Sequence, residues 1–234
     1  HRPWHRVLGV GVLLSALAAS ATPALGTWSI ILVNPRTGEI GAGCATCIAN
    51  DDLRNATVAI VPGFGAANVQ ASFSFLQSPA NRVQIRDRLL LGEDPAAIIA
   101  YLATIDPSHQ SRQYGIVDRL GQAASFTGSA TSQWTGGQTG TIQTPDGPLV
   151  FAVQGNILTG ACVVEGIITA LATTPGDLPA RLMAGMQAAR DAGGDGRCSC
   201  GPSTPTTCGC PPPVFSKSAH TAFLMVSRAG DLES

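Results

Sequence analysis

The stretch Ala24-Leu25-Gly26-Thr27-Trp28-Ser29 marks the point where an apolar leader ends and the first strand of a folded domain begins. Before it, residues 7–25 carry no charge and are almost wholly apolar, and two arginines precede them. The residues one and three positions before Thr27 are small, as signal peptidase requires. This pattern predicts that residues 1–26 are a signal peptide and that Thr27 becomes the first residue of the mature chain.

An uncleaved membrane anchor is the competing interpretation, because about 20 apolar residues suffice to span a bilayer. Thr22, Pro23 and Gly26 interrupt the apolar run near its end and therefore favour cleavage. We expect an exported protein, periplasmic or extracellular, with no stable membrane insertion after cleavage.

The composition fits one domain after the leader, at residues 27–232 of the 234-residue chain. Charged residues make up 12% of the chain and the net charge is −1. The basic surface of a nucleic-acid binder is therefore absent, and we expect no nucleic-acid partner.

A hairpin is expected at the start of this domain. Thr27–Val33 is rich in strand-forming residues, and Asn34–Gly38 follows as a turn that contains one proline and one glycine. Glu39–Ile48 returns as a second strand of mostly small residues, which let other backbone approach closely. Thr27 is then the first residue of the hairpin.

The rest of the chain alternates between strands and pairs of helices. Helices are expected at Pro79–Leu91, Pro95–Ile105, Gly160–Thr173 and Asp177–Ala192, with N-caps Ser78, Asp94 and Asp177. Strands are expected at Ala56–Val61, Gln113–Asp118, Gln122–Thr127, Leu149–Gln154 and Ala219–Arg228, and strand or loop at Val69–Phe75. Two helix pairs can cover the outer faces of two stacked antiparallel sheets. The order predicts an α+β fold, a four-layer α/β/β/α sandwich.

Five stretches resemble one known family. They are Thr27–Ile30 followed by Thr37–Gly41, Arg112–Asp118, Ala124–Gly128, Gln154–Gly160 and Gly193–Arg197. These stretches are similar to the family of unknown function DUF1028, which is placed among the N-terminal-nucleophile (Ntn) hydrolase-like folds. The resemblance runs from Thr27 to about Arg228.

The resemblance implies that the first residue of the mature chain attacks an amide carbonyl in a small amide or peptide-like substrate. A threonine hydroxyl is a weak nucleophile until a base takes its proton. The α-amino group of Thr27 has an ordinary pKa of about 7.7–8.0 and can serve as that base. No cofactor and no metal is implied, and a homo-oligomer is left open. The alternative is that Thr27 only begins an edge strand.

Four further residues are candidates for the catalytic site. Gly155 and Asn156 follow a strand; the Asn156 amide is a candidate oxyanion donor to which Gly155 allows close approach, or else the two form a turn with a capping asparagine. Asp195 orients the α-amino group or, with Arg197, holds a loop. Ser218 relays protons or is an ordinary strand-edge serine.

A hydrolase of the Ser-His-Asp type is not indicated. His109 and His220 are the only histidines after the leader, and neither lies in a cluster typical of a catalytic triad. No Gly-x-Ser-x-Gly motif is present.

The sequence also departs from proteasome-like Ntn hydrolases, which carry an aspartate near the end of the second strand and a lysine further on. The second strand here offers Cys44, Thr46 and Cys47, and Lys217 is the only lysine. These departures favour the alternative function, a non-catalytic binding or envelope-associated module that is exported.

Residues 198–217 are a cysteine- and proline-rich insertion relative to the family. Two Cys-x-Cys pairs, at 198/200 and 208/210, fit either zinc or disulfides, and export favours disulfides. Because cysteines two positions apart cannot easily bridge each other, we expect cross-pairing between the two sets. Cys44 or Cys47 then pairs with Cys162, or these three stay reduced and buried. Seven cysteines leave at least one unpaired within the chain.

Overall fold

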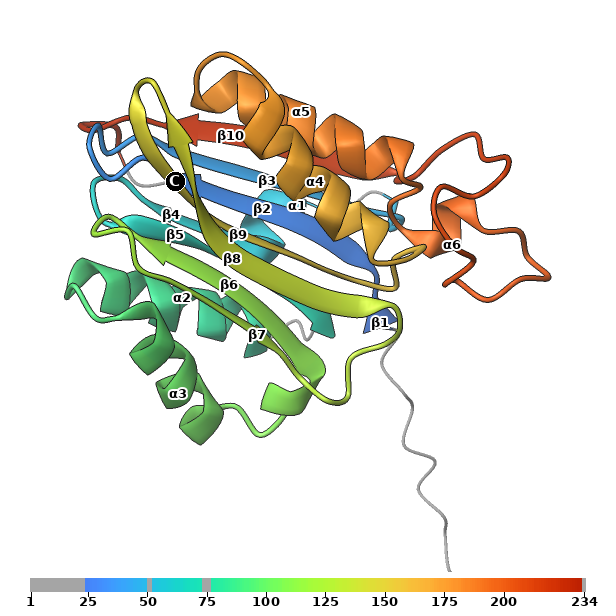
Figure 1. Ribbon diagram of the computed structural model, residues 1–234. Coiled ribbons are helices and arrows are strands. Elements are labelled where there is room, and N and C mark those ends of the chain that lie inside the picture. Colours follow the sequence, from blue (N-terminus) through green and yellow to red (C-terminus); the bar gives the residue numbers. More distant parts are fainter. Residues whose placement is uncertain (1–23, 50–51, 73–76, 233–234) are drawn as a thin grey trace, which may run out of the picture.

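The structure is a computed structural model that describes residues 24–49, 52–72 and 77–232 (Figure 1). Most of the expected signal peptide, residues 1–23, lies outside the described residues. Among the described residues, no helix is long and apolar enough to cross a membrane.

Two antiparallel sheets form the centre of the fold. The first sheet has the strand order β10 (Thr221–Ser227), β3 (Ile40–Thr46), β2 (Thr27–Val33), β9 (Gly147–Asn156) and β8 (Thr135–Thr144). In the second sheet, β5 (Gly65–Ser72) pairs on one edge with β6 (Arg112–Asp118), which pairs with β7 (Ala123–Thr127). The other edge of β5 is shared by β4 (Val58–Val61) and the two-residue β1 (Ala24–Leu25).

Helices cover both outer faces of the sheets, as Figure 1 shows. The second sheet is covered by α2 (Gln77–Leu90) and α3 (Pro95–Ile105), and the first by α4 (Cys162–Thr173) and α5 (Leu178–Asp191). Shorter helices are α1 (Leu53–Thr57), a 3₁₀ turn at His109–Ser111 and α6 (Gly196–Ser199).

The core confirms the four-layer α/β/β/α sandwich. On β2, Trp28, Ile30 and Leu32 pack in an apolar cluster with residues of α4 and α5. Ile31 and Val33 point to the other face and pack between the two sheets. A third apolar cluster joins the second sheet to α2 and α3. Because side chains alternate along a strand, each sheet is buried on both faces.

Two expectations about local structure were wrong. Strand β8 was not expected, because its residues are mostly threonine, glycine and glutamine and most of it lacks apolar alternation. It is nevertheless paired with β9 from Thr135 to Thr144. Helix α2 begins at Gln77, so Ser78 lies inside the helix and does not precede it. The caps at Asp94 and Asp177 are confirmed.

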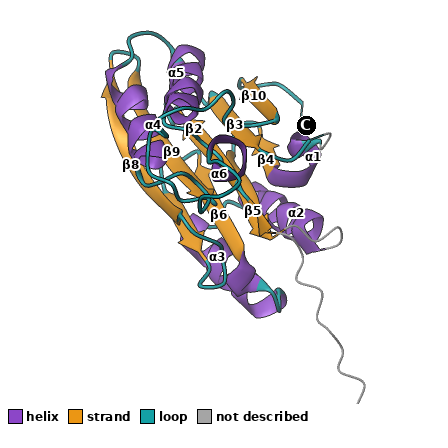
Figure 2. Cartoon of the chain, turned by 90° about the vertical axis from the view of Figure 1, so that its right-hand side faces the viewer, coloured by secondary structure: helices purple, strands orange, loops and turns teal. Residues whose placement is uncertain are grey.

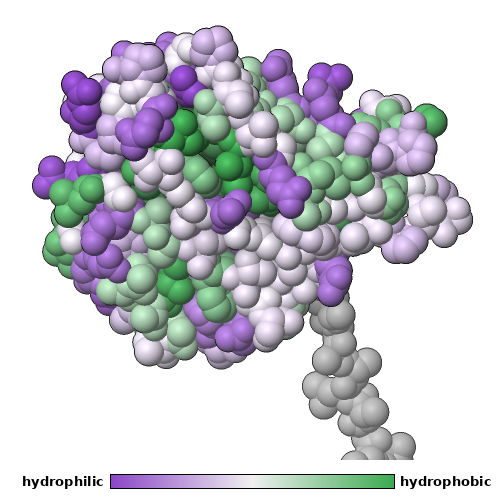
Figure 3. Space-filling view, in the orientation of Figure 1, coloured by the Kyte–Doolittle hydropathy of each residue, from purple (hydrophilic) through white to green (hydrophobic). Residues whose placement is uncertain are grey.

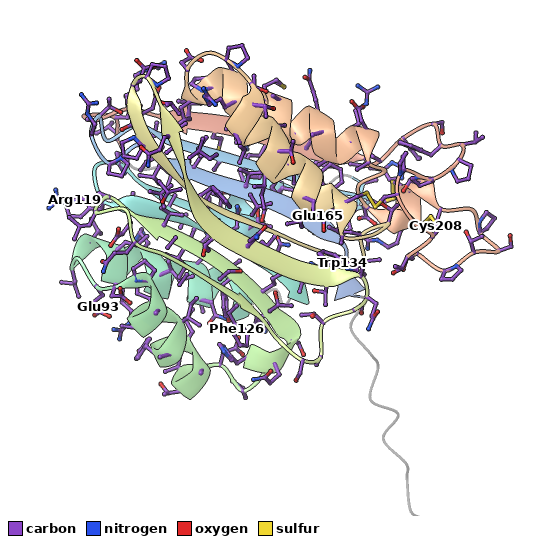
Figure 4. All side chains as sticks on the ribbon, in the orientation of Figure 1. Glu93, Arg119, Phe126, Trp134, Glu165 and Cys208 are labelled. Atoms are coloured by element: carbon purple, nitrogen blue, oxygen red, sulfur yellow. A yellow bond between two sulfur atoms is a disulfide. The ribbon has the colours of Figure 1, made fainter. Side chains whose placement is uncertain are left out.

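The cysteines form three disulfides, Cys47–Cys198, Cys162–Cys210 and Cys200–Cys208. The expected cross-pairing is confirmed for Cys200–Cys208 and wrong for Cys198 and Cys210. These two residues reach back to the end of β3 and the start of α4. The insertion, residues 198–217, projects from the sandwich, with Cys208 on the projecting part (Figures 3 and 4). The two long-range disulfides tie Cys198 and Cys210 of the insertion to the sandwich.

A buried ion pair joins α3 to the second sheet. Asp106 caps the C-terminal end of α3, and its Oδ2 accepts from Arg112 Nε at 2.9 Å and Asn81 Nδ2 at 2.6 Å. Asn81 Nδ2 also donates to the Tyr114 hydroxyl at 3.0 Å. Burial raises the pKa of the Asp106 carboxyl, but the hydrogen bonds from Arg112, Asn81 and the Ser108 amide hold it below its ordinary value.

We predict that Asp106→Ala lowers the free energy of unfolding by about 3–5 kcal/mol, because it leaves the buried Arg112 guanidinium without its carboxylate. Asp87→Ala, which breaks the exposed pair with Arg86, is the control and should cost less than about 1 kcal/mol. Urea denaturation with disulfides intact measures both.

The cost of Asp106→Ala should also depend on pH. The folded pKa of Asp106 is depressed, so its contribution is present above the unfolded pKa of about 3.9 and is lost as the pH falls through the folded pKa. A difference between wild type and variant that is unchanged in acid would contradict this assignment.

Candidate functional site

Thr27 lies at the start of the central strand of the first sheet and is almost fully buried. It pairs with Thr46 on β3 and with Asn156 on β9. By strand alternation its side chain shares the face of Ile31 and Val33, which points between the two sheets. Figure 2 looks onto this end of the sandwich, with α6 in front of the strand ends.

The peptide bond that precedes Thr27 is held by two donors. The carbonyl oxygen of Gly26 accepts a hydrogen bond from Arg197 Nη2 at 2.7 Å and another from the Thr46 hydroxyl. Arg197 belongs to α6 and Thr46 is the last residue of β3. Two donors on one carbonyl oxygen draw electron density from its carbon, which is the arrangement that an oxyanion requires.

Asp195 anchors these donors and is fully buried. Its Oδ1 accepts from the Arg197 backbone N and Nε, each at 3.0 Å. Its Oδ2 accepts from Arg197 Nη2 at 2.6 Å and from the Cys47 amide at 2.8 Å. The Cys47–Cys198 disulfide crosses at the same place. The carboxylate thus fixes α6 against the end of β3 and orients the Arg197 guanidinium.

The structure brings Gly155 and Asn156 next to Thr27, because the end of β9 runs beside the start of β2. Asn156 Nδ2 donates to Gln113 Oε1 at 3.3 Å. The donors to the Gly26 carbonyl are Arg197 and Thr46, to which the sequence analysis gave no such role. The hairpin of β2 and β3 could have indicated Thr46, because its register places Thr46 directly opposite Thr27.

Ser218 reaches the site through its backbone, since its carbonyl oxygen accepts from the Asp195 amide at 3.0 Å. The residue also lines an apolar surface groove with Trp28 and Met186. This groove lies on the α5 side of the first sheet, the face opposite to that of Thr27.

Polar side chains fill the space between the sheets beside Thr27. We call them the inter-sheet polar layer, which consists of Ser29, Asn68, Gln70, Gln113, Gln154 and Asn156. Gln70 Nε2 donates to the Thr27 carbonyl at 3.2 Å and to Gln113 Oε1 at 2.7 Å. Gln113 Nε2 lies 3.0 Å from the Gly155 carbonyl. In the sequence, this layer is indicated by polar residues at alternate positions of strands that are otherwise apolar.

Several atoms of this layer have no hydrogen-bond partner among the described residues. They are Ser29 Oγ, both polar atoms of Asn68, Gln70 Oε1, both polar atoms of Gln154, and Asn156 Oδ1. A buried polar atom without a partner costs about 1–3 kcal/mol, so apolar residues would be the more stable choice here. The layer therefore departs from what stability alone would select.

The family model of DUF1028, a family of unknown function, matches residues 27–202. The chain belongs to this family. The match begins at Thr27, so the DUF1028 domain starts with the residue that follows the expected cut. None of the curated proteins matches the chain.

A crystal structure of a protein from Silicibacter pomeroyi, also described as DUF1028, is similar to this chain. The identity is 24% and the TM-score is 0.57, with 70% of each chain covered. This similarity concerns the fold of DUF1028 proteins and not their chemistry.

Two histidines and one lysine lie among the described residues of this DUF1028 chain. His220 adjoins the site through its backbone, since its amide donates to the Thr46 carbonyl at 2.8 Å. Lys217 is exposed, with its Nζ 3.1 Å from His220 Nε2. His109 stacks on Phe126 at 4.1 Å between ring centroids, and burial lowers its pKa. Cys47, Cys198 and His220 bring possible metal-ligating atoms within 4.8 Å of one another, but the two cysteines share a disulfide.

Cys44 is the one cysteine outside a disulfide, and it is buried. Burial raises the pKa of its thiol to about 12, against a smaller opposing effect of the Thr57 hydroxyl. The reactive thiolate is therefore scarce at every ordinary pH.

We predict that iodoacetamide at pH 8.5 alkylates native protein about a thousandfold more slowly than protein unfolded in guanidinium with its disulfides intact. Mass spectrometry should find one modified cysteine, Cys44, in the unfolded sample only. Labelling at any other cysteine would contradict the three disulfides.

Proposed function

We propose that this chain is an exported amide-bond hydrolase, amidase- or peptidase-like, that uses Thr27 as an N-terminal nucleophile. The main support for the proposal is the pair of hydrogen-bond donors on the Gly26–Thr27 peptide bond. Its carbonyl oxygen meets the donors Arg197 and Thr46 beside the buried Asp195. The start of the DUF1028 match at Thr27 supports the same assignment.

Removal of residues 1–26 supplies the base. In the uncut chain the nitrogen of Thr27 is an amide whose lone pair is delocalised into the carbonyl. In the cut chain it is an amine with an ordinary pKa of about 7.7–8.0, on the same residue as the hydroxyl. The amine takes the hydroxyl proton as Oγ adds to the substrate carbonyl carbon.

The remaining steps follow from the same groups. Arg197 and Thr46 donate to the tetrahedral oxyanion, and the α-ammonium returns its proton to the leaving amine as the C–N bond breaks. Water, deprotonated by the α-amine, then hydrolyses the ester on Thr27 and releases the acid.

The neighbouring residues have supporting roles in this proposal. Asp195 stabilises the α-ammonium that forms during the reaction and keeps Arg197 in place. Asn156, with Gly155 beside it, is a third donor to the oxyanion in this proposal. Ser218 positions Asp195 through its carbonyl. A small amide or peptide-like compound is the substrate.

Export is part of the proposal. Three disulfides persist in an oxidising compartment, either the periplasm or the extracellular space. The same compartment is where signal peptidase frees Thr27.

A specific observation favours the second candidate function, a non-catalytic exported binding module. Lys217, the only lysine, is exposed with its Nζ beside His220 Nε2, and β3 offers Cys44 and Thr46 in place of an acidic residue. A lysine that lowers the pKa of the nucleophile is thus missing from the site.

Thr27 variants separate the two functions. We predict that exported protein begins with Thr27 and forms an ester with a β-lactone probe, seen as a mass increase on the N-terminal peptide. Thr27→Ala should abolish labelling, Thr27→Ser should retain it, and Thr173→Ala, an exposed threonine, should leave it unchanged. The labelling rate should rise with pH as the α-amine loses its proton, near pH 7.7–8.0.

An added residue before Thr27 should block labelling, because it converts the amine into an amide. Labelling that survives this addition, or a mature chain that starts elsewhere, would refute the hydrolase and leave the binding module.

A further inference from the structure

The last residues of the expected leader form a strand of the second sheet. Ala24 and Leu25 make up β1, which pairs antiparallel with the end of β5 in the register Ala24↔Ser72 and Leu25↔Ala71. β4 covers only Gly65–Asn68 of the same edge. Removal of the leader therefore leaves backbone groups of β5 unpaired, and such an edge accepts an extended peptide as an added strand.

The backbone at this edge is held in an uncommon conformation. Ala71, the partner of Leu25, has a φ of +86°, in the left-handed region that residues with a Cβ rarely adopt. Non-glycine residues in this region cluster at ligand sites. Ile157, which contacts Gly26, is the other such residue in the described chain, with a φ of +54°.

Gly26 lies where no side chain fits. A Cβ on this residue would lie 2.8 Å from Ile157 Cβ and 2.9 and 3.0 Å from the carboxylate oxygens of Asp195. Neither neighbour can yield easily. Asp195 is held by Arg197 and the Cys47 amide, and the Ile157 carbonyl accepts from the Gly196 amide at 2.8 Å.

The carbonyl of Gly26 is also close to the nucleophile. Three bonds join the Thr27 nitrogen to its Oγ, so the carbonyl carbon bonded to that nitrogen lies within about 4 Å of Oγ in compact rotamers. A substrate carbonyl moved from this place only far enough to make van der Waals contact with the freed amine stays close to Oγ, Arg197 and Thr46.

We propose that the mature protein binds an extended peptide-like substrate in the place that residues 24–26 occupy, with glycine as the residue whose carbonyl is attacked. This inference rests on the proposed function and gives it a substrate class, amides of peptides that end in glycine. Thr27 Oγ adds to the glycyl carbonyl, the C–N bond breaks, and the amine leaves with a proton. Water hydrolyses the ester to a glycine carboxylate.

The charges at the site suit this product. Asp195 and Arg197 neutralise each other, and the freed α-ammonium of Thr27 adds one positive charge below its pKa. A peptide that ends in a glycine carboxylate supplies the matching negative charge, which the Arg197 guanidinium can bind.

The test measures binding apart from catalysis. Thr27→Ala protein, exported so that the chain begins at residue 27, is titrated with two fluorescein-labelled peptides that carry free carboxylates. The first is leader residues 21–26, Ala-Thr-Pro-Ala-Leu-Gly, and the second ends in alanine instead. Fluorescence anisotropy should show that the glycine peptide binds at least tenfold more tightly.

A variant of the wall of the site checks the cause of this preference. Ile157→Gly removes one of the atoms that would clash with an alanine side chain, and glycine adopts the positive φ of this position readily. The preference for the glycine peptide should therefore fall severalfold. Some preference should remain, because the Asp195 oxygens still exclude a side chain. Leu91→Gly, at an exposed residue, is the control and should leave the preference unchanged. Circular dichroism confirms that each variant is folded.

The outcomes separate this inference from the proposed function. Equal affinity for the two peptides, or no binding of either at millimolar concentration, overturns the inference, even if Thr27 reacts with the β-lactone. Glycine-selective binding by a protein whose Thr27 does not react supports the inference as a peptide site and overturns the hydrolase.

Discussion

The contact between the Asp195 carboxylate and Arg197 holds the candidate site together. The pair is buried on the carboxylate side, and removal of either partner would leave an uncompensated charge at the junction of three elements. The same carboxylate accepts the Cys47 amide at the end of β3. Arg197, so oriented, reaches the Gly26 carbonyl. The position of the Gly26–Thr27 bond thus depends on a residue far along the chain.

The inter-sheet polar layer and the apolar clusters divide the sandwich into two parts. Where Ile31 and Val33 lie, the sheets pack through aliphatic side chains and provide stability. Toward Thr27 the same strands carry amides and hydroxyls, several without partners among the described residues. Proteins accept such local costs mainly where they bind or react. The division agrees with the position of the candidate site at the strand ends.

The sequence was informative where local rules act. The strand at Thr27–Val33 and the caps Asp94 and Asp177 follow from residue types within a few positions of one another. The fold class was inferred from the order of such elements. The sequence was uninformative where cross-strand pairing decides the structure without a local pattern of apolar residues. β8 is specified by its pairing with β9, not by apolar alternation.

The site shows the same division. Thr27, Asn156 and Asp195 were predicted to belong to one site, and the structure places them together, with their chemical roles still proposals. The contacts of Arg197 and Thr46 with the Gly26 carbonyl depend on the register of β2 and β3 and on the disulfide between Cys198 and Cys47. No local sequence pattern encodes either feature.

The hydrogen bond from Arg197 to Gly26 joins residues 171 positions apart. During synthesis Gly26 is made before Arg197 and Cys198, 171 positions ahead of Arg197. A ribosome-bound fragment therefore contains the threonine without the groups that surround it. The full set of hydrogen bonds that surround the Gly26 carbonyl can therefore form only after translation has passed residue 197.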